Sequence, residues 1–128
     1  MITETKYFTP SEAKRTLPLV KKIVKDILDT TKEMRLIADD VNGKIEEGRT
    51  WNQIQKMAGE VNGFIKELEE IGCLYKDWNF TVGLVDFPSV IDEREVYLCW
   101  RSDEDDIKFY HRIEEGYRGR KLIPEQYL

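Results

Sequence analysis

The hydrophobic period of this chain changes once, at Gly72, and this change constrains the fold more than any other feature. Before Gly72, apolar residues recur every three or four positions, which is the period of one helix face. After it, apolar and polar residues alternate, and aromatic and β-branched residues concentrate, which is typical of strands. The sequence therefore predicts an α+β protein in which a helical half precedes a β half.

The first helix is predicted over residues 10–47. Thr9 and Glu12 form a capping box, in which each side chain accepts a hydrogen bond from the backbone N–H of the other residue. Pro18 has no N–H to donate to the helix, so we expect a kink near 17–18. The apolar seam that defines this helix consists of Leu17, Val20, Val24, Ile27, Thr31, Met34, Ala38, Val41 and Ile45.

The second helix is predicted over residues 51–71 and ends at Gly72. Thr50 and Gln53 form its capping box. Its seam consists of Trp51, Ile54, Ala58, Val61, Ile65 and Leu68. Because the connection between the two helices is short, their apolar faces must pack against each other, which predicts a long antiparallel helical hairpin.

The segment 80–113 is predicted to form a three-stranded antiparallel β-meander. Its strands are residues 80–87, 95–101 and 107–113. Pro88 is expected to end the first strand, and the polar turn 102–106 separates the second from the third. Since three strands need to bury one face, we expect the helical hairpin to pack on the meander. Residues 114–128 are predicted to form a looped tail.

Composition narrows the class of protein further. The chain, predicted to be one domain over residues 1–128, is 41% hydrophobic and 35% charged, which excludes a disordered chain. No apolar run reaches the roughly 20 residues of a spanning helix, and the start lacks a secretory pattern. We therefore expect a cytoplasmic protein with reduced thiols and no membrane partner. The net charge of −5 argues against a nucleic-acid partner.

The turn at 102–106 sets a register that makes a chemical site conceivable. If Tyr97 lies opposite His111, then Cys99 and His111 become diagonal neighbours on one sheet face, roughly 7–8 Å apart between Cα atoms. That face is predicted to hold Tyr97, Cys99, Arg101, Ile107, Phe109 and His111.

Thiolate and imidazole groups suit a soft divalent cation, and carboxylates can add oxygen ligands. The candidate metal- or ligand-binding residues are therefore Asp86, Cys99, Glu104 and His111, with a divalent metal ion as the candidate cofactor. The alternative is structural, because buried free cysteines and single histidines commonly serve the core.

Three arginines, Arg101, Arg118 and Arg120, have a similar pair of interpretations. They can converge on a small anion, because guanidinium groups bind carboxylate and phosphate oxygens bidentately. More commonly, such residues form ion pairs that tie a glycine-rich tail to the sheet. The sequence contains no nucleophile elbow, phosphate loop or dinucleotide fingerprint, so no catalytic residue is assigned.

Several motifs of the β half resemble those of one family. They are Gly83–Pro88, Val96–Arg101 with Glu104, His111, and the Gly116–Arg120 tail. The chain resembles the prokaryotic domain-of-unknown-function family 2203 over nearly its whole length. It departs from that family's pattern at Asp103, where the family has glycine, and at Tyr110, where the family has tryptophan. The resemblance implies no known activity.

Two functional classes remain open at this level. We expect a non-catalytic assembly or interaction module that forms a homodimer, through coiled-coil packing of its long helices or through the uncovered sheet face. The alternative is a small-molecule-binding or metal-binding protein, or an enzyme, that uses the site on the second and third strands.

Overall fold

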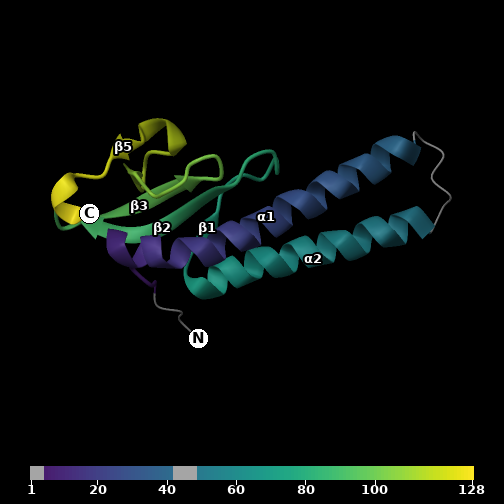
Figure 1. The fold of residues 1–128 in the computed structure, drawn as a ribbon, viewed down its shortest axis with the longest axis horizontal. Coiled ribbons are helices and arrows are strands. Elements are labelled where there is room, and N and C mark those ends of the chain that lie inside the picture. The colour runs from purple at the N-terminus through teal and green to yellow at the C-terminus, as the bar shows by residue number, and fades with distance from the viewer. Residues whose placement is uncertain (1–4, 42–48) are drawn as a thin grey trace.

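The computed structural model describes residues 5–41 and 49–128 and has a helical layer and a sheet layer (Figure 1). The helices are α1 (Pro10–Val41) and α2 (Arg49–Ile71). The strands are β1 (Leu74–Tyr75), β2 (Leu84–Ile91), β3 (Arg94–Arg101), β4 (Phe109–Arg112) and β5 (Lys121–Leu122). Two short 3-10 helices, η1 (Tyr117–Gly119) and η2 (Glu125–Tyr127), lie in the C-terminal tail. The predicted α+β class is confirmed.

Helix α1 begins with the capping box that the sequence predicts. Glu12 N–H donates to the Thr9 hydroxyl at 3.1 Å, and Thr9 N–H donates to the Glu12 carboxylate at the same distance. The helix continues through Pro18 as one element, so the chain does not break at 17–18. A proline removes one helical hydrogen bond, but Leu17 and Val20 beside it are buried in the core and hold the helix in place.

The two helices lie side by side and run in opposite directions (Figure 1). The predicted end of the first helix and the turn of the hairpin fall in residues 42–48, outside the described residues. Helix α2 ends at Gly72, which has a φ of +108°. Cys73 N–H donates to Leu68 O at 2.9 Å and Gly72 N–H to Glu69 O at 3.0 Å, which is the Schellman pattern of helix termination.

The sheet has five antiparallel strands in the order β1-β2-β3-β4-β5, so the predicted number of three is wrong. The two additional strands, β1 and β5, are each two residues long. A two-residue strand is too short to show an alternation of apolar and polar residues, which is why the sequence pattern missed both.

Strand β2 runs through Pro88, which was expected to end it. The Pro88 carbonyl accepts a hydrogen bond from Phe8 N–H at 2.7 Å. It therefore points away from β3, toward the N-terminal segment that lies along this edge of the sheet. The N–H that proline lacks would point to the same edge and is not needed for pairing with β3. The predicted start at Phe80 is also wrong, because Phe80 lies in a turn with a φ of +56°.

The third predicted strand is shorter than expected, and Ile107 precedes it. Ile107 is fully buried in the same core cluster as Leu98 and Trp100. It therefore does not share a face with Cys99, as the extended pairing had predicted. Pairing between β3 and β4 ends at Cys99 and Phe109, and the chain beyond it turns toward the core.

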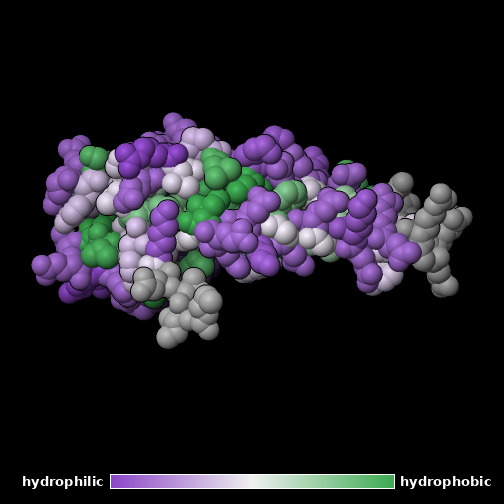
Figure 2. Space-filling view, turned by 90° about the horizontal axis from the view of Figure 1, so that it is seen from below, coloured by the Kyte–Doolittle hydropathy of each residue, from purple (hydrophilic) through white to green (hydrophobic). Residues whose placement is uncertain are grey.

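The core lies between the helices and one face of the sheet. This inner face presents Val85, Phe87, Leu98 and Trp100 to both helices. Hydrophobic surface gathers close to the sheet, whereas the projecting ends of the helix pair are mostly hydrophilic (Figure 2). Neither α1 nor α2, over its described residues, is long and apolar enough to cross a bilayer. The opposite, outer face of the sheet does not pack on the helices and carries both polar and aromatic side chains.

Candidate functional site

Three predicted site residues meet on the outer face, one from each central strand. Asp86 of β2 lies opposite Cys99 of β3, while Tyr97 lies opposite His111 of β4. This is the β3–β4 register that the sequence predicts. The donor atoms of Asp86, Cys99 and His111 lie within 4.8 Å of one another. The three residues are only 3%, 2% and 4% exposed, respectively.

The hydrogen bonds of His111 carry the chemistry of this cluster. Nδ1 lies 2.8 Å from the Arg112 carbonyl oxygen, and Nε2 lies 3.2 Å from each carboxylate oxygen of Asp86. A carbonyl can only accept, so Nδ1 carries a hydrogen. In a neutral ring, Nε2 would then turn a lone pair toward the carboxylate. A proton shared between Nε2 and the carboxylate, or a metal ion bound by both, satisfies this arrangement.

A proton at this position is favoured by the carboxylate. The hydrogen bond with Asp86 raises the pKa of His111 above its usual value, and burial opposes that rise. The ring is held further by an edge contact with Tyr97, whose centroid lies 5.6 Å away. His111 thus has a fixed orientation, with Nε2 directed at Asp86.

Cys99 is not an activated nucleophile in the metal-free protein. Burial raises the pKa of the Cys99 thiol to about 12, and the negative charge of Asp86 adds to that rise. Reactive cysteines have a lowered pKa, so a Cys-His-Asp catalytic triad does not fit this environment. A bound metal ion would lower the pKa of the Cys99 thiol, because a coordinating thiol loses its proton.

Glu104, the fourth candidate ligand, lies in a different contact. Its carboxylate accepts a hydrogen bond from Arg101 N–H at 2.8 Å and two from Arg120 Nη2 at 2.6 and 2.7 Å. Its position in the turn after β3 places it three residues from the backbone donor that holds it. The structure therefore joins Glu104 to the tail rather than to Asp86, Cys99 and His111.

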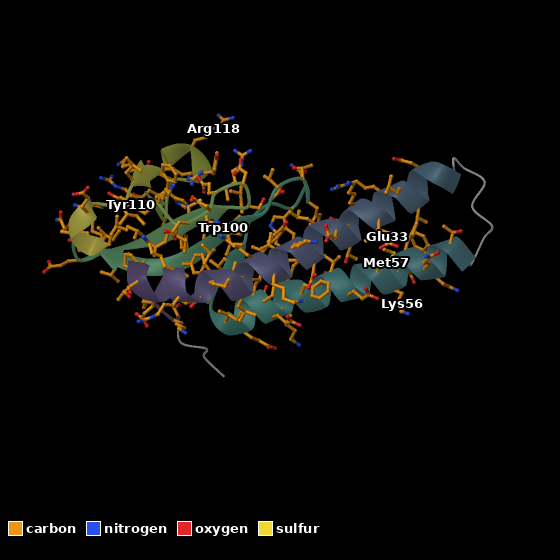
Figure 3. All side chains as sticks on the ribbon, viewed as in Figure 1. Glu33, Lys56, Met57, Trp100, Tyr110 and Arg118 are labelled. Atoms are coloured by element: carbon orange, nitrogen blue, oxygen red, sulfur yellow. The ribbon has the colours of Figure 1, made fainter. Side chains whose placement is uncertain are left out.

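The three candidate arginines do not converge on one point. Besides its contact with Glu104, the Arg120 guanidinium lies over the rings of Phe109 and Tyr117, at 4.1 and 4.7 Å from their centroids. Arg101 donates to the Tyr117 hydroxyl at 2.8 Å. Arg118 is exposed on η1 and points away from the sheet (Figure 3). Arg101 and Arg120 thus tie the tail to the sheet.

The structure adds residues around the cluster that the sequence reasoning did not name as site residues. A surface groove of about 250 Å³ is lined by Asp86, Cys99 and His111 together with residues from the segment after β1, from β2 and β3, from the β4–η1 turn and from η1. The additional lining residues are Lys76, Leu84, Tyr97, Ile113, Glu115, Gly116 and Tyr117. Lys76 follows a strand of two residues and Tyr117 begins a 3-10 helix of three residues, so no periodic pattern marked them.

The fold and site together define a class: a two-layer α+β protein with a buried carboxylate–thiol–imidazole cluster on the outer face of its sheet. A family model for an uncharacterized conserved protein, DUF2203, matches residues 6–123. The chain belongs to this family, as the motifs of its β half predicted. No curated protein and no solved structure gave a significant match.

Proposed function

We propose that this chain is a metal-binding domain that holds a divalent cation of the zinc type through Asp86, Cys99 and His111. The observation that carries the proposal is the pairing of His111, whose two ring nitrogens both face oxygen acceptors. A cation at Nε2 would satisfy the imidazole and the carboxylate at once. It would also convert the nearby Cys99 thiol into a ligand.

The donor set supports zinc or a similar ion. Zinc binds sulfur, imidazole nitrogen and carboxylate oxygen, and sites with three protein ligands keep a fourth position open. The contact between Nδ1 and the Arg112 carbonyl matches the way metal-ligating histidines are usually oriented by an outer hydrogen bond. The groove beside the cluster supplies access to the open position.

The competing interpretation is a buried imidazolium–carboxylate pair without metal. It shares the Asp86–His111 contact but leaves Cys99 a neutral thiol beside Asp86. The two interpretations therefore differ most in the state of Cys99, which is a metal-bound thiolate in one and a free thiol in the other. A test of the metal site has to detect the thiolate.

The test is a cobalt titration of the reduced, metal-free protein. We expect one equivalent of Co²⁺ to produce visible d–d bands and a near-ultraviolet thiolate-to-cobalt band. The substitution Cys99→Ser should remove the thiolate band, whereas Cys73→Ser, which changes the other buried free cysteine, should retain it. His111→Gln provides a second variant if Cys99→Ser does not fold. Absence of a stoichiometric complex, or equal loss in both cysteine variants, would contradict the proposal.

Self-association is a second candidate function. The apolar side chains Leu36 of α1 and Trp51 of α2 are more than half exposed. One end of the helix pair projects beyond the sheet (Figure 1). Exposed large apolar side chains favour a partner surface, here a second copy of this chain. Sedimentation equilibrium should show a dimer that Leu36→Glu converts to monomer. A wild-type monomer at high concentration would exclude this function.

A further inference from the structure

We infer that the open position of the metal site binds a small monocarboxylate with an apolar body. This inference rests on the metal-binding function proposed above and adds the chemical class of the ligand.

With a divalent cation bound, the groove would carry an excess positive charge. A divalent cation would be balanced by the Asp86 carboxylate and the Cys99 thiolate, with His111 neutral. Lys76, which also lines the groove, then contributes an excess positive charge. Its Nζ lies over the Tyr97 ring, 5.5 Å from the centroid, and no carboxylate of the described residues forms an ion pair with it.

The one acidic side chain among the additional lining residues does not cancel this charge. Glu115 already has a cationic neighbour, because Arg112 Nε lies 3.6 Å from its carboxylate. The groove therefore favours an anion, with one oxygen on the metal ion and its remaining charge near Lys76.

The side chains of the groove suit a carboxylate better than a phosphate group. A phosphate group carries more charge and is usually held by arginine forks. The two arginines close to the groove are engaged, Arg120 with Glu104 and Arg101 with the Tyr117 hydroxyl. One lysine and one metal position match a singly charged group better.

The lining of the groove favours a ligand whose body is apolar. Leu84, Tyr97, Ile113 and Tyr117 give the groove a largely apolar and aromatic lining. The volume of about 250 Å³ fits a small molecule. An apolar or aromatic body attached to the carboxylate would remove this lining from water and add affinity.

The experiment uses the cobalt-loaded full chain and follows its d–d bands. Benzoate should shift the bands at lower concentration than acetate, and the neutral analogue benzamide should leave them unchanged. The substitution Lys76→Met should weaken benzoate binding by about tenfold, which corresponds to the loss of one charge-assisted contact. It should leave cobalt affinity unchanged. Lys66→Met, an exposed lysine on α2, is the matched control and should have no effect.

The outcomes separate this inference from the metal site itself. If cobalt does not bind, both proposals fail. If cobalt binds but benzoate leaves its spectrum unchanged, or Lys76→Met equals Lys66→Met, the ligand class is wrong and the metal site stands. Tighter binding of inorganic phosphate than of benzoate would also overturn the carboxylate assignment.

Discussion

The two faces of the central strands differ in chemistry although the same strands supply both. Successive residues along each strand point to opposite faces. Along β2 and β3, Phe87 and Leu98 point to the helices, whereas their neighbours Asp86 and Cys99 point to the outer face. The inner face is apolar and packs on two helices. The outer face carries the polar cluster of Asp86, Cys99 and His111 among apolar and aromatic side chains, and the C-terminal tail covers part of it. Alternation with a period of two thus separates the part of the sheet that stabilises the fold from the part that carries chemistry.

The first prediction concerns the stability that the inner face supplies, and it has the greatest expected change in unfolding free energy. Trp100 is buried, and its indole N–H donates to the Glu104 carbonyl at 2.9 Å. Trp100→Ala should lower the free energy of unfolding by about 3–5 kcal/mol, because it opens a large cavity. Urea denaturation measures the change. Trp78→Ala, at a tryptophan that is 61% exposed, should cost about 1 kcal/mol or less. An equal loss of unfolding free energy in the two variants would contradict the assignment of the inner face as the part that stabilises the fold.

The second prediction concerns the outer face and its metal ion. Zinc at about 100 times its dissociation constant should raise the free energy of unfolding by about 2.7 kcal/mol. A chelator should reverse the gain, and Cys99→Ser should reduce it strongly. The measurement is thermal or urea unfolding with and without zinc. A gain that persists in Cys99→Ser would place the ion elsewhere.

The third prediction tests the tail that covers part of the outer face. Arg120→Met leaves the Glu104 carboxylate, which is mostly buried, without its cationic partner. We expect a loss of about 2 kcal/mol in the free energy of unfolding. The exposed Arg118 is the control, and Arg118→Met should be close to neutral. Similar losses in the two variants would show that the ion pair does not tie the tail to the sheet.

The smallest predicted effect depends on pH and concerns Cys73, which is buried in the apolar core. Burial raises the pKa of its thiol to about 12. Between its ordinary pKa and this value the unfolded chain loses the proton and the folded chain keeps it, so stability falls as the pH rises. The advantage of wild type over Cys73→Ala should shrink by about 1–2 kcal/mol between pH 7 and pH 10.

The control for this pH effect is Val61→Ala, which removes a buried side chain without an ionisable group. Its cost should be the same at pH 7 and pH 10. If the costs of the two substitutions change together, the pH dependence does not come from the Cys73 thiol.

Much of the fold was predictable because its main signals are local or periodic. The Thr9 capping box, the helix end at Gly72 and the register of Tyr97 with His111 follow from short-range chemistry. The course of β2 through Pro88 was not predictable, because it depends on the N-terminal segment that lies along the sheet edge. The strands β1 and β5 are too short to leave a pattern.

The candidate site was predictable in part for the same reason. Alternation brought Cys99 and His111 to one face, but the position of Asp86 depends on the turn between β2 and β3. That turn places Asp92 and Glu93 at positive φ without a glycine, so the sequence gives little sign of it. The assignment of Glu104 to this cluster was wrong because its carboxylate accepts hydrogen bonds from the backbone of its own turn and from Arg120 of the tail.

X-ray absorption at the zinc edge of the zinc-loaded, reduced protein would identify the ligands of the ion. We expect one sulfur ligand at about 2.3 Å and nitrogen or oxygen ligands at about 2.0–2.2 Å. The sulfur contribution should be lost in Cys99→Ser and kept in Cys73→Ser. A first shell of nitrogen and oxygen only, in the wild-type protein, would contradict a metal site built on Asp86, Cys99 and His111.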